Sequence, residues 1–563
     1  MRLREAGDSA LLLQFDPVID ASVNARVIAI ADAVRARQVA GVRDVVSTFS
    51  SVAVYFDPLI VSIDAVRDLL RSVTNTAVSA PMSGRVIDVP VSYGGEAGPD
   101  IADVAALTGL TETEIARRHA DATYRVFMLG FLPGFAYMGS VDERIAVPRR
   151  ASPRLRVPAG SVGIAGRQTG IYPIESPGGW QIVGRTSLRV FDPERAEPCV
   201  FAPGDSVRFV GRVRRKPDTT TENFDAGTPN VRASRSQSAG GARLQNGVSD
   251  SGRTSRRTIT VISPGLFTTV QDEGRWGHQS SGVSVAGAMD LISHRLANAL
   301  VGNDRNAATL EITLHGPELR FETDTVVAVA GADLTPTVDG ASVRHLSPTP
   351  CRQGSVLRFG DRRDSARAYL AVGGGVAVSP VLDSRSTHTM TGIGGFAGRR
   401  LRAGDVVPVG ESTFATRSGR SIPSGPRPRA VRLRAIPGPQ DDFFESVAFD
   451  ILQHTRFTVS PQSNRMGYRL TGGQPIPRRA DREMISDATF AGGLQIPLSG
   501  EPILLMADRQ TTGGYPQIAT VISADLPAAA QLAPGDSVQF ELCSRAVAIS
   551  ALVAQEARLL ASI

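Results

Sequence analysis

The chain has 563 residues, which is more than one hydrophobic core usually supports, and this length predicts about three or four domains. Its 56 glycines and 36 prolines, with only 6% aromatic residues, favour short strands joined by turns over helical bundles. We find no apolar run long enough to cross a membrane and no signal-peptide pattern, so we expect a cytoplasmic protein that does not bind membranes. Cys199, Cys351 and Cys543 are too scattered for a disulfide framework or a CxxC metal site.

Residues 1–80 are expected to form a small α+β domain. Strands are predicted near 10–15, 44–49 and 52–56, and helices near 21–37 and 63–73, which is the order of a split βαβ layer. In the first helix, Val23, Val27, Ile30 and Val34 recur at helical spacing. This stripe indicates a core face rather than a cofactor site.

Residues 85–210 begin with a strand, RVIDVPVSY, and continue with two short helices before a Gly/Pro-rich stretch. Thr111 and Glu114 have the spacing of a capping box at the start of the second helix. The helix pair resembles a helix-turn-helix, but the domain is neutral and lacks a charged recognition face, so we expect no DNA binding.

One eight-residue phrase occurs twice, as APGDSVRF at 202–209 and as APGDSVQF at 533–540. Each copy predicts a turn that enters a strand. A looser copy, LRAGDVVPV, ends near 409, and the stretch GRQTGIYPIESPGG is echoed by ADRQTTGGYPQIAT further along the chain. The repeats predict three related β-barrels in series, over 85–210, 259–425 and 430–563.

Residues 211–258 are predicted to be a disordered basic linker. They hold ten basic and four acidic residues and few aliphatic ones, so they carry the whole net charge of +6. Lys216 in this segment is the only lysine of the chain. A lysine nucleophile, a biotinyl lysine and a Walker-type phosphate lysine are therefore excluded from the folded domains, and anions must be bound by arginines and backbone amides.

The passage 127–186 is the most distinctive candidate for chemistry, because its glycines let backbone amides approach an anion and its arginines can bind carboxylate or phosphate. Its glycines and prolines are equally compatible with tight barrel turns. We expect a composite site that joins this passage to the second half of the chain. The candidate binding residues are Arg154, Gln168, Tyr172, Gly178, Gly179, Trp180, Arg385, Gln510 and Tyr515, and the candidate catalytic residues are Asp272, Asp290 and Asp508.

Several enzyme classes lack their motifs in this chain. The seven histidines show no HExxH or other metal spacing, so no metal site is predicted, and neither a GxSxG elbow nor a GxxxxGK[ST] loop occurs. Metal hydrolases, serine hydrolases and P-loop kinases are therefore disfavoured.

The chain resembles a fusion of 5-oxoprolinase subunits B and C, which are also catalogued as allophanate hydrolase subunits 1 and 2. The first half is similar through GFLPGFAYMG and PRRASPRLRVPAGSVGIAGRQTGIYPIESPGGW, and the second through VQDEGRWG, GVSVAGAMD, SRSTHT, RMGYRL and LMADRQTTGGYPQIATVISADL. The resemblance extends to the carboxyltransferase part of urea carboxylase and to a sporulation kinase inhibitor and its antagonist. It implies a mainly β fold, with an α+β N-terminal domain and tandem cyclophilin-like β-barrels.

The resemblance implies three functions. The first is ATP-dependent activation of the 5-oxo-L-proline lactam, with ATP and its accompanying Mg²⁺ as cofactors and with the separate 5-oxoprolinase A subunit as the partner that completes hydrolysis to L-glutamate. The second is carboxyl transfer from biotin carried by another chain, and the third is regulation of a sensor histidine kinase. A homo-oligomer is compatible with all three. Allophanate hydrolysis itself is rejected, because it implies a Ser-Ser-Lys arrangement and no folded domain offers a lysine.

Overall fold

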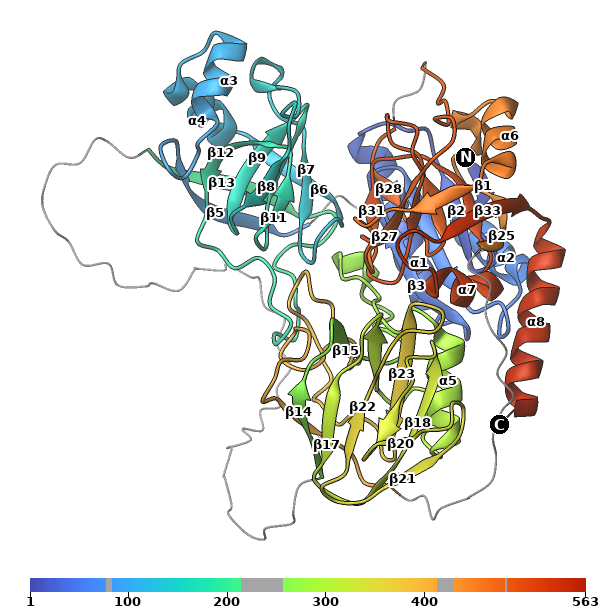
Figure 1. The fold of residues 1–563 in the computed structure, drawn as a ribbon. Coiled ribbons are helices and arrows are strands. Elements are labelled where there is room, and N and C mark those ends of the chain that lie inside the picture. The colour runs from blue at the N-terminus through green and yellow to red at the C-terminus, as the bar shows by residue number, and fades with distance from the viewer. Residues whose placement is uncertain (77–83, 214–256, 413–429, 481–483, 563) are drawn as a thin grey trace, which may run out of the picture.

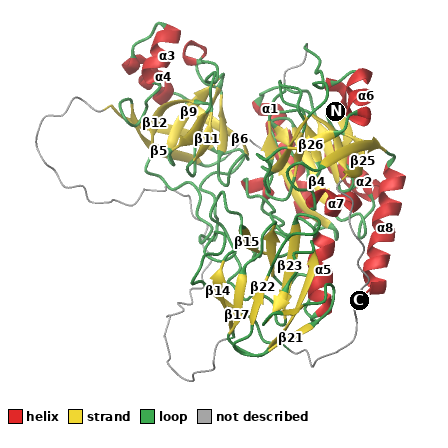
Figure 2. Ribbon diagram, viewed as in Figure 1, coloured by secondary structure: helices red, strands yellow, loops and turns green. Residues whose placement is uncertain are grey.

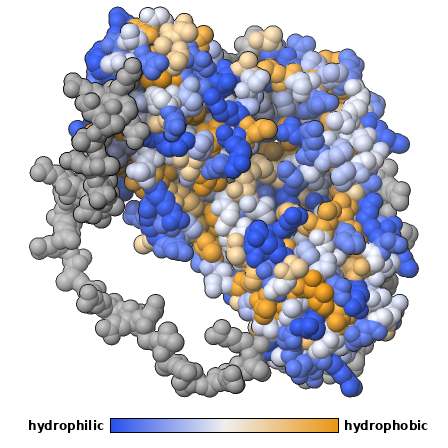
Figure 3. Space-filling model, turned by 60° about the vertical axis from the view of Figure 1, so that its left-hand side comes forward, coloured by the Kyte–Doolittle hydropathy of each residue, from blue (hydrophilic) through white to orange (hydrophobic). Residues whose placement is uncertain are grey.

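The computed structural model describes residues 1–76, 84–213, 257–412, 430–480 and 484–562 (Figure 1). The predicted linker at 211–258 lies almost entirely outside these residues. Strands account for more of the described chain than helices do, and several helices lie against the faces of the sheets (Figure 2). Its surface carries apolar residues scattered among polar ones (Figure 3), as is usual for a folded protein.

The N-terminal unit, residues 1–76, is a four-stranded antiparallel sheet covered by two helices. The sheet has the order β1 (Arg2–Glu5), β2 (Ala10–Gln14), β4 (Ser51–Phe56), β3 (Val42–Ser47), and the helices are α1 (Ala21–Ala36) and α2 (Ile63–Thr76). The Asp20 carboxylate caps α1 by accepting from the Ser22 and Val23 amides. Val27, Ile30 and Val34 are buried in the core, whereas Val23 is only partly buried, so the predicted core stripe is confirmed for three of its four residues.

The first barrel, residues 84–213, is closed by seven strands in the order β10-β7-β6-β13-β5-β12-β9. These are β5 (Val86–Tyr93), β6 (Thr123–Leu129), β7 (Ala136–Gly139), β9 (Ser161–Ala165), β10 (Gln168–Ile171), β12 (Gln181–Arg185) and β13 (Ser206–Val213). The expected helix pair is α3 (Ile101–Thr108) and α4 (Glu112–Asp121), and Thr111 caps α4 through a 3.2 Å bond from the Glu114 amide. β8 (Arg154–Val157) and β11 (Ser176–Gly178) form a separate two-stranded ribbon.

The sandwich, residues 257–412, consists of two sheets that pack on one core. The six-stranded sheet has the order β20 (Ala341–Ser342), β19 (Thr337–Val338), β22 (Val356–Arg358), β17 (Glu318–Phe321), β14 (Thr258–Ser263), β24 (Val406–Pro408). The five-stranded sheet has the order β15 (Phe267–Gln271), β16 (Thr309–Thr313), β23 (Arg367–Val372), β18 (Thr325–Gly331), β21 (Thr349–Cys351), and α5 (Leu291–Leu300) covers its outer face.

The sequence predicts a closed barrel over 259–425, and the structure corrects this for the described residues. The looser AGD phrase does form the expected turn, because Asp405 accepts from the Arg402 amide at 2.7 Å. However, the strand that follows, β24, has only three residues, pairs antiparallel with β14 and stays at the sheet edge. The ladder therefore ends there instead of closing.

The second barrel, residues 430–542, is closed by β25 (Ala430–Pro437), β26 (Phe457–Val459), β27 (Gly467–Thr471), β29 (Gly493–Gln495), β30 (Ile503–Leu505), β32 (Gln517–Val521) and β33 (Ser537–Leu542). Its ribbon is β28 (Asp487–Ala488) with β31 (Thr512–Gly513). The helices of this part are α6 (Ser446–His454), α7 (Leu526–Ala530) and α8 (Arg545–Ser562). No helix of the described residues is long and apolar enough to cross a membrane.

The two barrels are copies of one design, as the repeated phrase predicts. Read around the closed ladder, β30-β27-β26-β33-β25-β32-β29 of the second barrel repeats the order of the first. The strand after the PGD turn makes the same pairings in both barrels. β13 pairs parallel with β5 and antiparallel with β6, and β33 pairs parallel with β25 and antiparallel with β26. Gly204 and Gly535 supply the positive φ of the turn, at 96° and 90°. The second repeated stretch, which contains Arg-Gln-Thr, does not occupy equivalent positions in the two barrels. It opens β10 in the first barrel and follows β30 in the second.

The N-terminal unit packs against the second barrel (Figure 1), and it also contacts the first barrel through Asn24 and Phe49. Asp8 accepts from the amide and hydroxyl of Ser523 at 2.9 and 2.6 Å, and the Tyr55 hydroxyl donates to the Thr489 carbonyl at 2.8 Å. The two halves of the chain are therefore joined by a hydrogen-bonded interface in addition to any covalent connection.

Candidate functional site

A cavity of about 500 Å³ lies between the sandwich and the second barrel. Its polar side chains come from stretches that are distant in sequence, and the fold brings them together at the interface of the two units. The polar lining residues on which the following description depends are Arg367, His388, Arg400, Arg465, Tyr468 and Asp508.

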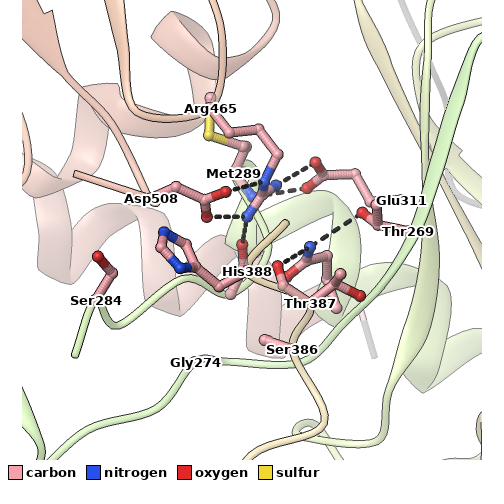
Figure 4. Close-up of polar contacts among 12 residues, drawn as sticks. Thr269, Gly274, Ser284, Met289, Glu311, Ser386, Thr387, His388, Arg465 and Asp508 are labelled. Atoms are coloured by element: carbon pink, nitrogen blue, oxygen red, sulfur yellow. Dashed lines mark hydrogen bonds and ion pairs between the residues drawn. The ribbon is translucent and has the colours of Figure 1, made fainter. Parts of the chain in front are cut away.

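Arg465 forms a buried ionic network on one side of this cavity (Figure 4). Its guanidinium contacts Asp508 through Nη2–Oδ1 at 2.9 Å and Nε–Oδ2 at 3.1 Å, donates to the Gly287 carbonyl at 2.6 Å and pairs with Glu311. Burial lowers the pKa of Arg465, but the charges of Asp508 and Glu311 outweigh it and hold the pKa above its ordinary value. The arginine therefore stays charged and fixed.

Glu311 connects this network to a second buried arginine. Its carboxylate accepts from the Met289 amide at 2.9 Å and from the Tyr369 hydroxyl at 2.8 Å. Arg367 lies 3.9 Å from Glu311 and donates to the Tyr468 hydroxyl at 2.6 Å. The charges of Arg465 and Arg367 are thus balanced by those of Glu311 and Asp508, so this ionic network is polar but carries no net charge.

His388 is the buried cavity residue with an unused ring nitrogen. Its Nδ1 lies 2.6 Å from the Thr391 hydroxyl, whereas within the described residues its Nε2 has no hydrogen-bond partner. Burial lowers the pKa of His388, although the neighbouring Asp508 carboxylate opposes this effect. The ring is therefore neutral near pH 7, which is the form that a general base requires.

Asp272, a predicted catalytic residue, instead holds the loop that presents His388. It accepts from the Gly274 amide, the Ser384 hydroxyl and the Arg385 amide at 2.9, 2.7 and 2.6 Å, and it is bonded to the Ser386 hydroxyl. With four donors its lone pairs are largely occupied. Its placement indicates a structural role.

Asp290 and Arg385 are similarly occupied. Asp290 caps α5 by accepting from the Ser293 amide and hydroxyl at 2.9 and 2.6 Å, and it also accepts from Gln531 at 2.7 Å. The Arg385 side chain donates to the Val378 carbonyl at 2.8 Å. Of the three predicted catalytic aspartates, only Asp508 lines the cavity, and it is ion-paired there.

In the first barrel, Tyr172 and Trp180 belong to a buried aromatic cluster around Phe135, with ring centroids 5.4 and 5.5 Å from the Phe135 ring. Burial raises the pKa of Tyr172 to about 12, so its hydroxyl stays protonated. Gly178 lies against this hydroxyl, because a Cβ added there would be 2.4 Å from it.

Arg154 does not have the free guanidinium that the sequence suggests. It pairs with the buried Asp100 carboxylate at 2.7 and 2.5 Å, and Arg150 contacts the same carboxylate at 2.7 Å. Gln168 opens β10, and the Gly179 carbonyl accepts from the Arg150 amide at 2.8 Å. This part of the predicted site is therefore held together by its own contacts.

The first barrel contacts the second half of the chain close to the cavity, although the cavity is lined by second-half residues alone. Met390 lines the cavity and also packs against the aromatic cluster of the first barrel. Nearby, the Phe131 amide donates to the Thr512 hydroxyl at 3.0 Å. Gln510 and Tyr515 are not cavity residues, and the carbonyl of each accepts a hydrogen bond from within the second barrel.

The motifs SRSTHT and RMGYRL contain His388 and Arg465, but local sequence does not place either residue in the site. The local sequence around Glu311 and Arg367 does not identify them as site residues, because single charged residues inside predicted strands are common. Their function depends on which side chains the fold brings together, and no local spacing reports that.

Comparison with known proteins supports the fusion. A "Carboxyltransferase domain, subdomain C and D" model matches residues 1–201, and a "Carboxyltransferase domain, subdomain A and B" model matches residues 281–542. The C subunit of 5-oxoprolinase from Escherichia coli (strain K12) is 42% identical over 293 residues, covering 52% of this chain and 94% of that protein. The B subunit of 5-oxoprolinase from Escherichia coli O157:H7 is 44% identical over 205 residues, covering 36% of this chain and 93% of that protein.

A solved structure is similar over both halves at once. The crystal structure of TTHA0988 has a TM-score of 0.80 and 34% sequence identity, and the match covers 94% of this chain and 99% of that chain. The relative placement of the units is thus shared with an experimentally determined protein.

Proposed function

Because the chain belongs to the family of 5-oxoprolinase subunits B and C, joined here in one polypeptide, we propose that it activates the lactam of 5-oxo-L-proline for ATP-dependent ring opening to L-glutamate. The separate A subunit of 5-oxoprolinase completes the hydrolysis. The observation that carries the proposal is that each half matches one of these subunits over more than nine tenths of its length. The interface between the halves supports a single working unit.

In this proposal the cavity binds the lactam, and the neutral His388 serves as a base. The lactam oxygen attacks the γ-phosphorus of ATP, the bond from that phosphorus to the bridging oxygen breaks, and ADP leaves. Nε2 of His388 takes the proton from the lactam nitrogen, which leaves a cyclic imidoyl phosphate. Water adds to its carbon, the bond from that carbon to the ring nitrogen breaks as the nitrogen takes up a proton, and the opened product is γ-glutamyl phosphate. A second water then releases phosphate and leaves glutamate. Phosphorylation supplies the leaving group that a lactam lacks.

Arginines and backbone donors are the groups that stabilise a transferring phosphoryl group. Arg400 is an exposed arginine of the cavity lining, where it donates to the Leu266 carbonyl at 3.1 Å. Mg²⁺ would arrive with the nucleotide and neutralise phosphate charge. Asp508 and Glu311 are engaged by Arg465, and the described residues contain no cluster of three or more acidic, His or Cys side chains that could hold a metal.

The test follows ADP and glutamate together, with the purified chain, the A subunit and 5-oxoproline, and without biotin. Coupled release of both products supports the proposal, and their absence contradicts it. His388→Gln should slow coupled turnover by about 10²-fold or more, as expected for loss of a general base. The matched control is His454→Gln, at an exposed histidine of α6, and it should retain full activity. Unchanged turnover in His388→Gln would remove the cavity from the mechanism.

Carboxyl transfer is the second candidate, because both matching models are carboxyltransferase models. That reaction needs a biotinyl carrier from another chain, since the only lysine here is Lys216. Adding a biotinylated carrier protein and its biotin carboxylase, with bicarbonate, ATP and urea, distinguishes the two. Biotin-dependent carboxylation of urea would favour this candidate over lactam activation.

A further inference from the structure

The loop 381–388, which ends at the cavity residue His388, is held by side chains of one earlier stretch, 271–275. Asp272 accepts from donors of this loop, as described above. Arg275 also contacts the loop, and its side chain is among the largest fully buried ones of the described residues. The motifs VQDEGRWG and SRSTHT therefore meet in one structural element next to the cavity.

The Arg275 guanidinium donates to three backbone carbonyls of this loop. Its Nε donates to the Val381 carbonyl at 2.8 Å, and its Nη2 donates to the Ser386 and Ser384 carbonyls at 2.9 and 3.4 Å. The same Nη2 lies close to Gly394, where an added Cβ would be 2.5 Å from it. The guanidinium thus lies between the loop and the turn that follows it, and there is no space for a larger side chain at that turn.

Arg275 is a buried cation whose hydrogen bonds all go to neutral groups. Within the described residues its partners are backbone carbonyls, and its Nη1 is buried without a partner. Burial lowers the pKa of Arg275 to about 10, although the charges of Asp272 and Asp508 oppose this effect, so the side chain is still charged near neutral pH. A buried charge that is not directly paired is costly, and strongly shifted groups of this kind gather at functional sites.

The charge of Arg275 acts on the His388 ring. Burial has the largest effect and lowers the pKa of His388, Asp508 opposes it, and the charges of Arg275 and Arg465 lower the pKa further. A second positive charge on the ring is unfavourable beside these cations. Arg465 is directly paired with Asp508 and Glu311, so Arg275 is the neighbouring cation without a bonded carboxylate.

We infer that Arg275 is a positioning residue for this site: its hydrogen bonds fix the loop that ends at His388, and its buried charge keeps the ring in the basic form. The inference rests on the proposed function for the role of His388 as the base. Arg275 itself is not a lining residue of the cavity, so it acts through His388 and not on the substrate. Its two contributions are separable, because lysine keeps the charge but cannot reproduce the donor fork of a guanidinium.

The first experiment follows the ring of His388 by NMR, with the full chain isotope-labelled at the histidine Cε1 atoms. The chain has seven histidines, and His388→Gln identifies the signal of His388. In Arg275→Gln the midpoint of this titration should move to higher pH, toward the ordinary histidine value of about 6.5, because the ring loses a neighbouring positive charge. In Arg275→Lys the midpoint should stay close to that of wild type. Arg320→Gln, at an exposed arginine of β17, is the matched control and should leave the midpoint unchanged.

The second experiment measures turnover of the same variants with the A subunit. Arg275→Lys should lower kcat by about tenfold or more, because a small displacement of a catalytic group is costly, while the acid limb of kcat/KM stays where it is in wild type. Arg275→Gln should lower kcat as well and should also move the acid limb to higher pH. Arg320→Gln should retain full activity.

The outcomes separate this inference from the proposed function. Unchanged turnover in His388→Gln would remove the base and the positioning role together with it. If His388→Gln is inactive but the His388 midpoint is the same in Arg275→Gln as in wild type, the inference is overturned while the proposed function stands. If Arg275→Gln does not fold, Arg275→Lys decides: a fall in kcat with an unchanged midpoint supports the inference, and a wild-type kcat overturns it.

Discussion

Arg465 and Asp508 form a buried two-point ion pair that joins the bend before β27 to the loop after β30, with N–O distances of 2.9 and 3.1 Å. Glu311 from the sandwich contacts the same guanidinium, so the pair also holds the two units together at the cavity. A buried charge that loses its partner is strongly destabilising, whereas an exposed charge is not.

Arg465→Ala should therefore destabilise the fold, because it leaves Asp508 and Glu311 buried without their cation. We expect a loss of about 3–5 kcal/mol in the unfolding transition that includes the second barrel. Arg469→Ala, at an exposed arginine of β27, is the matched control and should cost no more than about 0.5 kcal/mol. Urea denaturation followed by intrinsic fluorescence measures both. Equal stabilities of the two variants would contradict the buried-network interpretation.

The pH dependence of activity tests His388. Burial lowers the pKa of His388 below the ordinary histidine value of about 6.5, and a base works only when it is unprotonated. The value of kcat/KM should therefore stay constant from about pH 8 down to below about pH 6.5 and fall only in stronger acid. In His388→Gln this acid limb should disappear along with most of the activity. An acid limb centred above about pH 7 would exclude His388 as the base.

Much of the fold follows from local sequence, and the paired PGD turns show why. The Asp205 and Asp536 carboxylates each accept from the amide three residues earlier, at 2.8 Å in both barrels, so the residues that specify the turn are contiguous. The closure of a barrel depends on longer-range pairing, and for this reason the AGD phrase at 403–405 predicts its turn correctly but not a barrel.

The candidate site was less predictable, because its residues acquire their roles from distant partners. Arg154 looks like an anion-binding arginine until Asp100, from another loop, neutralises it. His388 and Asp508 meet only because the sandwich packs on the second barrel. Residue type indicated which chemistry was available, whereas tertiary packing determined which groups remain accessible to a ligand.

The interface between the N-terminal unit and the second barrel should re-form in trans. Separate chains of residues 1–213 and 257–563 are expected to associate when mixed, because Asp8–Ser523, Tyr55–Thr489 and Asp487–Ser51 are contacts between them. Isothermal titration calorimetry measures the affinity. Absence of any complex by size-exclusion chromatography would show that this interface needs the covalent connection.

That association should also tighten as the pH is lowered from neutrality toward about 5. Burial raises the pKa of Asp487, and the Ser51, Gln14 and Thr48 bonds only partly offset it. A carboxyl group with a raised pKa in the complex favours its protonated form there, so affinity is gained at low pH and lost as the pH rises through that pKa. Asp487→Asn should make the affinity of the two fragments depend less strongly on pH. The remaining pH dependence should keep its direction, because burial also raises the pKa values of Asp8 and Asp44. A steeper slope in the variant would contradict this account.

Gly178 and Gly179 should respond differently to the same substitution, although they are neighbours. A Cβ at Gly178 would lie 2.4 Å from the Tyr172 hydroxyl oxygen, whereas at Gly179 the nearest atom, in Pro153, is 3.7 Å away. Because Tyr172 is held in a packed aromatic cluster, it cannot move aside without disturbing Phe135 and Trp180. Gly178→Ala should therefore destabilise the first barrel by about 1–3 kcal/mol, as overpacking usually does, while Gly179→Ala should stay within about 0.5 kcal/mol of wild type. Thermal unfolding followed by near-ultraviolet circular dichroism reports on the cluster directly. If the two variants melt alike, the Gly178–Tyr172 contact does not constrain this loop.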